Sequence, residues 1–342
     1  MSCELLFSAD DRTGSLEIGG LVANRDLPVP VGPHARSDRC CVVDIATRHL
    51  SPREAQDRMQ QVLGIEAATR AHKMDAGLRG NWAYEIEVLL HAGFKVAVVC
   101  AYPDAGRVCV DGVVYIHGLP VLDSVFGQDP LNAPVSSRPR EVLEHCGVSG
   151  DVVVWDAADN AAMQAAVARA RAEHRLLVGA SGALGELAAQ LLGSDRQQRI
   201  ELPRPRWVVC GSLNPLSRAQ IEALDGPVRL MEGARAAMAY STHGDGTVLT
   251  TPVPSGAISP GEAEAKAQEI AEFVRGGWEW FRTLVIVGGD TVGAIVGEDT
   301  LEVLGEVAPG IPVSSFRQRL LVTKGGGIGT PDVLCRLLEE SC

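Results

Sequence analysis

The sequence predicts an α/β protein of two domains, each built on a mainly parallel sheet. Three observations lead to this prediction: β-branched runs alternate with helical stretches, the 342 residues exceed the length of one typical domain, and 46% of them are hydrophobic. The stretch "ELPRPRW" contains two prolines that suit a stiff connection. We therefore place the boundary near residue 204, with domains at 1–203 and 204–342.

The first half contains five expected strands, each followed by a turn and a helix candidate: "ELLFSA", "CCVVDIA", "KVAVVCA", "DVVVWDA" and "RLLVGAS". The segment "SPREAQDRMQQVL" carries a complete helix-start signal. Ser51 is the expected N-cap, Pro52 fits the first helical position, and Glu54 completes a capping box.

The second half repeats the strand-turn-helix pattern in "RWVVCGSLNPLSRAQIEAL", "RTLVIVGGDTVGAIVGE" and "LLVTKGGGIGTPDVLCRLL", beside a helix expected over 261–276. Ser217 and Gln220 are expected to form a capping box. Thr330 is expected to cap the last helix, with Pro331 at its first position.

Composition excludes several functional classes. The net charge is −12 and no block of Lys or Arg tracks a nucleic-acid backbone, so we expect no nucleic-acid partner. No run of about 18 apolar residues could span a bilayer. The amino-terminal "MSCELLFSADD" lacks signal-peptide features, which predicts a cytoplasmic protein without membrane contact.

Cysteine and histidine usage gives no metal-binding pattern. The nine cysteines include no CxxC pair, and the eight histidines show no HExxH or ligand spacing. We expect the cysteines to be small buried thiols in a reducing compartment, and the sequence names no metal ligands.

The residues at the ends of the expected strands differ between the two halves. Carboxylates stand after the strands of the first half: Asp10, Asp11, Asp44, Asp104 and Asp156. Glycines stand after those of the second half: Gly211, Gly288, Gly289 and the run from Gly325 to Gly329. Ligands bind at the carboxyl ends of parallel strands, so the first half suits a hydroxyl-bearing substrate and the second half a phosphate.

Two clusters in the first half are candidates for substrate binding. Asp10 and Asp11 could accept hydrogen bonds from substrate hydroxyls, with one acting as base, or could cap the next helix. The segment "HKMDAGLRGNW" places Lys73, Asp75, Arg79 and Asn81 before a helix, where Arg and Lys could clamp a carboxylate. For Asp44, Arg48, Asp104 and Arg107, solvation of a loop is the favoured interpretation.

The second half offers three candidate phosphate turns, which contain Ser212, Asn214, Gly288, Gly289, Gly325, Gly326 and Gly327. Bare backbone lets amides approach an anion closely, although a tight turn without a ligand is the alternative for any one of them. Neither a Walker A motif nor a GxGxxG fingerprint is present, so a nucleotide site depends on all three turns together.

The ordered motifs "ADDRTG", "KMDAGLRGN", "GSLNPLSRAQ", "GGDT" and "KGGGIGTPD" resemble the four-carbon acid sugar kinase family, also called DUF1537, over nearly the whole chain. The resemblance implies a sugar-acid-binding domain at 1–203, a nucleotide-binding domain at 204–342 and an active site in the interdomain cleft. It implies that threonate, erythronate or 3-oxo-tetronate is phosphorylated.

By motif, the resemblance places one group of residues at the sugar acid: Asp10, Asp11, Lys73, Asp75, Arg79 and Asn81. It places the seven residues of the three turns around ATP. Ala76 and Gly77 depart from the Ser-Thr pair common in the family, and Arg12 stands where an apolar residue is common.

We therefore expect an ATP- and Mg²⁺-dependent kinase of carbohydrate metabolism, with Asp11 or Asp75 as the catalytic base. A non-catalytic nucleotide or metabolite sensor on the same fold is the alternative, supported by Ala76 and Gly77. An NAD-dependent dehydrogenase would need a dinucleotide fingerprint where the first strand instead ends in "ADD". The sequence leaves a homodimer open.

Overall fold

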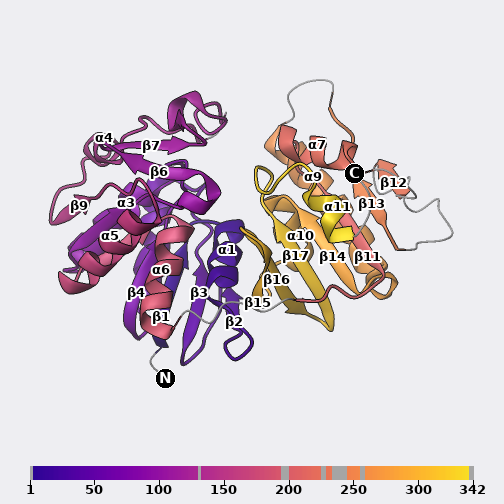
Figure 1. Ribbon diagram of the computed structural model, residues 1–342, viewed down its shortest axis with the longest axis horizontal. Coiled ribbons are helices and arrows are strands. Elements are labelled where there is room, and N and C mark those ends of the chain that lie inside the picture. The colour runs from indigo at the N-terminus through magenta and orange to yellow at the C-terminus, as the bar shows by residue number, and fades with distance from the viewer. Residues whose placement is uncertain are drawn as a thin grey trace. The chain divides into compact units, whose positions relative to one another are not determined.

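The computed structural model describes residues 3–129, 132–193, 200–224, 229–232, 245–254 and 259–338. The chain divides into unit 1, Met1–Arg196, and unit 2, Gln197–Cys342. Each unit is an α/β domain in which helices flank a series of paired strands (Figure 1). The predicted fold class, two α/β domains with mainly parallel sheets, is confirmed.

The main sheet of unit 1 is parallel, with strand order β2-β3-β1-β4-β10-β5-β9. The strands are β1 (Cys3–Ala9), β2 (Val29–Gly32), β3 (Cys40–Asp44), β4 (Ala67–Lys73), β5 (Val96–Val99), β9 (Val152–Val154) and β10 (Leu176–Gly179). All five strands expected in the first half are present. Strand β4 was not expected, because polar Thr69, Arg70 and His72 interrupt its apolar pattern.

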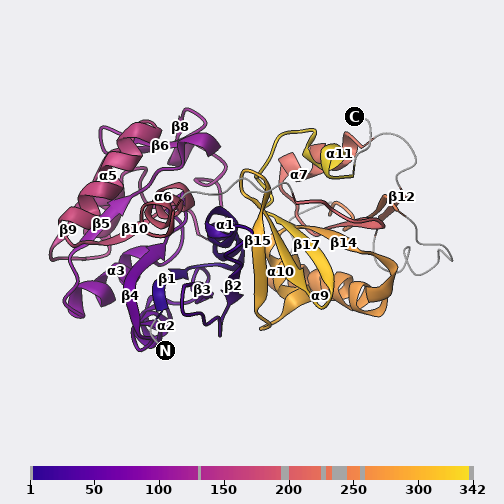
Figure 2. The same ribbon diagram turned by 60° about the horizontal axis from the view of Figure 1, so that its bottom comes forward.

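Helices cover both faces of this sheet (Figure 2). They are α1 (Arg12–Val22), α2 (Pro52–Leu63), α3 (Trp82–His91), α4 (Pro139–His145), α5 (Asn160–Ala172) and α6 (Ser181–Leu192). Helix α1 packs beside α6, and α2 packs beside α3 on the opposite face. Helix α2 begins with the expected capping box, since Ser51 and Glu54 each bind the other's backbone N–H.

A small antiparallel sheet comes after β5 in unit 1. It consists of β6 (Arg107–Val110), β7 (Val113–Ile116) and β8 (Leu119–Pro120). Its chain then leads through a short 3-10 turn, Val121–Asp123, toward Phe126 and Asp129. These two residues belong to the candidate site of unit 1.

The sheet of unit 2 has the strand order β12-β13-β11-β14-β17-β16-β15. The strands are β11 (Arg206–Cys210), β12 (Arg229–Glu232), β13 (Thr247–Thr250), β14 (Thr283–Val287), β15 (Leu301–Ala308), β16 (Ile311–Phe316) and β17 (Arg319–Lys324). From β12 to β17 in this order, each strand pairs in parallel with the next. The pairs β17–β16 and β16–β15 are antiparallel. The antiparallel hairpin was not expected.

The described helices of unit 2 are α7 (Pro215–Glu222), α9 (Pro260–Gly276), α10 (Gly289–Val296) and α11 (Val333–Leu338). Helix α9 confirms the helix predicted over 261–276. Helix α11 begins at Val333, two residues after the predicted start at Pro331, and the backbone N–H of Val333 donates to the carbonyl of Thr330.

Most cysteines match the expectation of buried thiols. Among the described residues seven are free, and all of these except Cys146 are buried. Cys335 departs from the expectation because it is disulfide-bonded. Within the described residues, no helix is long and apolar enough to cross a membrane, and no group of three or more His, Cys, Asp or Glu side chains could hold a metal ion.

Candidate functional site

The parallel register aligns the carboxyl ends of three neighbouring strands of unit 1. Ala9 pairs with both Asp44 and Lys73, which end β3 and β4. The residues directly after β1 and β4 therefore meet at one edge of the sheet. This alignment brings Asp10 and Asp11 together with Lys73 and Asp75, although more than sixty residues separate the two pairs in the chain.

Arg48 lies at the centre of this edge. Its guanidinium contacts Asp10 Oδ2 at 2.7 Å, Asp11 Oδ2 at 2.8 Å and Asp75 Oδ1 at 3.5 Å, and only 11% of its side chain is exposed. Asp44 is also buried and pairs with Arg12, Nε to Oδ2, at 2.7 Å. The interpretation of Arg48 and Asp44 as solvated loop residues is therefore wrong. It fails because their partners come from distant segments.

Asp75 and Arg79 form a bidentate ion pair. Arg79 Nε lies 2.9 Å from Asp75 Oδ2, and Nη2 lies 3.0 Å from Oδ1, while Nη1 reaches Asp129 Oδ2 at 2.8 Å. Burial would raise the pKa of Asp75, but Arg79 and Arg48 hold it far below its usual range. An acid this strongly paired is a poor proton acceptor, which argues against Asp75 as a base.

Asp10 and Lys73 have unused hydrogen-bonding capacity. Asp10 is 1% exposed, and its Oδ1 has no hydrogen-bond partner among the described residues. Lys73 Nζ lies 3.8 Å from this oxygen, beyond hydrogen-bonding distance. Lys73 is 4% exposed, and its amine donates no hydrogen bond within the described part of the chain. A buried carboxylate oxygen and a buried amine that face each other without bonding are suited to hold a polar ligand group.

Burial raises the pKa of Asp10 to about 6, although Arg48 and Lys73 lower it in part. Asp11, in contrast, accepts the backbone N–H of Gly14 at 2.9 Å and caps α1. The capping alternative for the aspartate pair is therefore realised at Asp11, which also pairs with Arg48. Of the two, Asp10 has the free oxygen and the pKa of a general base.

Asn81 supports the site from behind. Its Nδ2 donates to the carbonyls of Thr47 at 2.8 Å and Leu50 at 2.9 Å. These two carbonyls belong to the loop that carries Arg48. These two hydrogen bonds use the amide nitrogen of Asn81 and hold the loop in place.

Phe126 fills the space beside Gly77. A Cβ added to Gly77 would lie 2.6 Å from the Phe126 ring and 2.9 Å from Asp75 Oδ2. The ring also contacts Arg79, whose guanidinium lies 4.7 Å from the ring centroid. Ala76 and Gly77 lack the hydroxyl groups that the family commonly has at these positions. The ring of Phe126 lies beside Gly77 instead and packs against Arg79.

Replacing Gly77 by alanine is expected to displace Phe126 and loosen the Asp75–Arg79 pair, because ring and carboxylate both lie too close to a new methyl group. Affinity for an acidic ligand of unit 1 should fall roughly tenfold, the loss expected for one weakened charged hydrogen bond. Calorimetric titration of Gly77→Ala with threonate checks this, and Ala76→Ser is titrated in the same way for comparison. Equal affinity in Gly77→Ala and wild type would contradict it.

In unit 2, the three glycine turns meet around one cavity of about 280 Å³. Parallel register places Cys210, Val287 and Lys324 side by side at the strand ends that precede the turns. Four of the predicted nucleotide residues line the cavity: Ser212, Gly288, Gly289 and Gly326. Asp290, Thr291, Thr251 and Lys266 also line it, and sequence analysis assigned no site role to Thr251 or Lys266.

Helix α10 points its amino-terminal end at this cavity. Gly288, with φ of 114°, precedes the helix, and no side chain caps it. Such a φ favours glycine. The first amides of α10 lack an intrahelical partner and lie where an anion could accept their hydrogen bonds.

The turn that contains Gly325, Gly326 and Gly327 is held by polar side chains that bind its carbonyls. Ser217 Oγ donates to Gly326 O at 2.6 Å, and Gln220 Nε2 donates to Thr330 O at 2.9 Å. The predicted capping box of Ser217 and Gln220 is wrong. Helix α7 begins at Pro215, so Asn214 is its cap and the two polar side chains, one and two turns later, bind the glycine turn instead.

Lys324 was missed by the sequence analysis, although it directly precedes the three glycines. It is 1% exposed, and its Nζ donates to the carbonyls of Gly325 and Ile328, both at 2.9 Å. Burial lowers its pKa to about 8. Lys324 therefore fixes the glycine turn by its carbonyls, which leaves the backbone amides of the turn available.

Lys324→Met is expected to weaken binding of an ATP analogue about tenfold, because the turn loses its internal donor while the stem of the side chain keeps its volume. Titration with a non-hydrolysable ATP analogue measures this loss of affinity. Lys266→Met is titrated for comparison, because Lys266 lines the cavity whereas Lys324 holds the turn from behind it. Undiminished affinity in Lys324→Met would show that the turn does not need this anchor.

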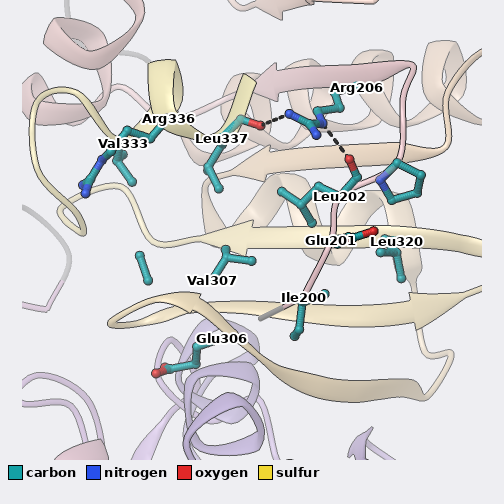
Figure 3. Close-up of a pocket in the computed structure, with 12 residues that line it drawn as sticks. Ile200, Glu201, Leu202, Arg206, Glu306, Val307, Leu320, Val333, Arg336 and Leu337 are labelled. Carbon is teal, nitrogen blue, oxygen red and sulfur yellow. Dashed lines mark hydrogen bonds between the residues drawn. The ribbon is translucent and has the colours of Figure 1, made fainter. Parts of the chain in front are cut away.

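A larger cavity of about 790 Å³ in unit 2 lies between the segment 200–206, strand β17 and helix α11 (Figure 3). It contains none of the predicted site residues. The guanidinium of Arg206 is bound to the carbonyls of Leu202 at 2.7 Å and Leu337 at 3.3 Å, as Figure 3 shows. The predicted site residues of unit 2 therefore gather at the smaller of these two cavities.

Known proteins resemble this chain over nearly its full length. A family model described as a sugar-binding N-terminal domain matches residues 5–148, and one described as a nucleotide-binding C-terminal domain matches residues 207–334. The chain is 26% identical to a D-threonate kinase of Salmonella typhimurium, covering 98% of this chain and 97% of the relative. It is 27% identical to a 3-oxo-tetronate kinase of Methylobacterium radiotolerans, covering 99% of each.

The fold also matches a solved structure. A DUF1537 protein of Haemophilus influenzae gives a TM-score of 0.68 at 17% identity, with 96% of this chain and 97% of that chain covered. At this identity the likeness concerns the fold.

Proposed function

The chain belongs to the four-carbon acid sugar kinase (DUF1537) family, and from this membership we propose that it phosphorylates a hydroxyl group of a small four-carbon sugar acid with ATP. The acid is of the threonate, erythronate or 3-oxo-tetronate type, in line with the names of the relatives. The observation that carries the proposal is the unbonded pair of Asp10 Oδ1 and Lys73 Nζ inside a cluster of acids and arginines.

Unit 1 is proposed to bind the acid. Lys73 supplies an amine that donates no hydrogen bond to any described residue, and Arg48 and Arg79 add positive charge beside it. Because Arg79 already binds Asp75 and Asp129, a ligand carboxylate would share this arginine with them. Asp10, Asp11 and Asp75 present the oxygens that could accept hydrogen bonds from hydroxyls of the substrate, while Asn81 holds the Arg48 loop.

Unit 2 is proposed to bind ATP at the 280 Å³ cavity. The amides of the turns at Ser212, Gly288, Gly289 and Gly326 would bind phosphate oxygens, with Lys266 as a nearby cation. Asn214, Gly325 and Gly327 support the turns from outside the cavity lining. The described wall of the cavity has no cluster of carboxylates for a resident metal, but Asp290, Ser212 and Thr291 offer oxygens to a magnesium–ATP complex.

The chemistry asks the protein to align donor and acceptor and to neutralise charge. Mg²⁺ bound to ATP would neutralise charge on the phosphates. Asp10 is proposed to accept the proton of the attacking hydroxyl, because its Oδ1 is free and its pKa lies near neutrality. Asp11 and Asp75, the bases expected from sequence, are each committed to several donors and would orient Arg48 and Arg79.

A coupled ADP-release assay with D-threonate, D-erythronate and 3-oxo-tetronate tests the proposed function, with titration of each acid and of an ATP analogue in parallel. We expect turnover with at least one acid and saturation of both sites. Binding of both ligands without turnover of any acid would instead favour the sensor alternative. No binding of any acid would remove the proposal.

A further inference from the structure

A hydrogen-bonded chain of four buried polar side chains lies directly beneath the cluster that Arg48 forms with Asp10, Asp11 and Asp75. The chain consists of Ser8, His72, Glu85 and Thr47, which come from β1, β4, α3 and the loop after β3. Ser8 is 3% exposed and the other three are fully buried. The proposed chemistry does not use them.

The hydrogen bonds of this chain are continuous. Ser8 Oγ lies 2.8 Å from His72 Nδ1, and His72 Nε2 lies 2.8 Å from Glu85 Oε2. The hydroxyl of Thr47 donates to the other oxygen, Glu85 Oε1. A carboxylate offers only acceptors, so Thr47 and the ring N–H of His72 are both donors to it. Both oxygens of a fully buried carboxylate are thereby satisfied, as low polarity requires.

The loop that ends this chain carries Arg48 and is strained. Ala46 adopts a positive φ of 49°, which is uncommon for a residue with a side chain. A conformation of this kind persists when its surroundings hold it in place. The backbone N–H groups of Thr47 and Arg48 donate to Asp10 O at 2.9 and 3.2 Å, and Asn81 binds the carbonyls of Thr47 and Leu50.

We propose that Glu85 and His72 are positioning residues, which act through Thr47 to hold the guanidinium of Arg48 between Asp10, Asp11 and Asp75. The side chain of Thr47 is the link, because its neighbour in sequence, Arg48, makes the contacts of 2.7 Å to Asp10 and 2.8 Å to Asp11. The role in acid binding rests on the proposed function. The role in placing Arg48 does not.

An isosteric pair of variants separates hydrogen bonding from packing. Thr47→Val keeps the shape of the side chain but removes the donor to Glu85, whereas Thr47→Ser keeps the hydroxyl. Glu87→Gln is the matched control on the same helix, since Glu87 faces Gln56 of α2 at 2.6 Å and lies outside the buried chain. Glu85→Gln leaves one acceptor oxygen where the carboxylate has two, so the contact with Thr47 or with His72 loses its acceptor, and the variant should act in the same direction as Thr47→Val.

The experiment combines crystal structures of these variants with titration by D-threonate and by an ATP analogue. In Thr47→Val and Glu85→Gln we expect Arg48 to lose its contact with Asp10, and D-threonate affinity to fall about tenfold or more while analogue affinity stays unchanged. Thr47→Ser should recover most of the affinity, and Glu87→Gln should match wild type. In an Arg48→Met background, Thr47→Val should cause little further loss, because both changes act through one side chain.

The two proposals fail in different ways. If Arg48 keeps its position in Thr47→Val and Glu85→Gln, or if Thr47→Val is additive with Arg48→Met, the positioning inference is overturned. If Arg48 moves in these variants while wild type binds no sugar acid, the inference about Arg48 stands and the proposed function falls. Should Glu85→Gln fail to fold, the Thr47 pair still decides between these outcomes.

Discussion

Gly326→Ala is expected to abolish measurable ATP binding, with a loss of about 100-fold or more. A Cβ at this position would lie 2.5 Å from Ser212 Oγ and 2.9 Å from Asn214 Cβ. The second of these atoms sits on the cap of α7 and cannot move away freely, so the glycine turn must shift. A shifted turn withdraws several amides from the phosphates, and each hydrogen bond to a charged group contributes about 1.5–3 kcal/mol.

The neighbouring glycine supplies a matched control. A Cβ at Gly327 would have only an ordinary contact, 3.5 Å from Asn214 Nδ2, so Gly327→Ala should keep most of the affinity. Both substitutions retain the backbone amide and differ only in the space for one methyl group. Calorimetric titration with a non-hydrolysable ATP analogue measures the contrast. Similar affinities in the two variants would mean that this turn does not surround the nucleotide.

Asp10→Asn is expected to lower kcat by about 100-fold or more, the usual contribution of a general base. The amide keeps the size of the side chain and its contact with Arg48 but cannot take the proton of the attacking hydroxyl. Steady-state kinetics with the preferred sugar acid measure the effect. Asp104→Asn is the control, because Asp104 also comes after a strand of unit 1 but is exposed and accepts a hydrogen bond from Asn160, at 2.7 Å, away from the acid cluster.

The pH dependence of Asp10 has a definite sign. With its pKa raised to about 6, Asp10 is protonated below this pH, so kcat/KM should fall as the pH drops through about 6. In Asp10→Asn this acid limb should disappear. Because the folded state holds the proton more tightly than the unfolded state, ionisation of Asp10 costs stability as the pH rises from about 4 through 6.

This linkage provides a check on folding. Asp10→Asn removes a charge that is costly to bury, so at pH 7 it should unfold at a Tm no lower than that of wild type. A strongly lowered Tm, or wild-type kcat with the acid limb intact, would contradict the assignment of Asp10.

Local signals in the sequence predicted local structure well. The capping box at Ser51 and Glu54 was foreseen because its residues and their partners lie within one turn. The same reasoning failed for Ser217 and Gln220, whose partners are carbonyls more than a hundred residues away. A pattern of residue types indicates which groups can bond, but the fold decides which partner is nearest.

In the candidate site, too, the local features were predictable and the long-range contacts were not. The carboxylates and glycines at strand ends were predictable, because parallel strands place their carboxyl ends at one edge. The central role of Arg48 was not, since it depends on three acids from two other strand ends. Strand β4 was missed because His72 interrupts an apolar pattern, and only the fold shows that Ser8 and Glu85 satisfy both of its ring nitrogens.

The most direct test of the whole account is a crystal structure with D-threonate and a non-hydrolysable ATP analogue bound together. We predict density for the acid within hydrogen-bonding distance of both Asp10 and Lys73, and density for the triphosphate against Gly288, Gly289 and Gly326. Acid density elsewhere in unit 1, or a nucleotide bound away from these turns, would contradict the account.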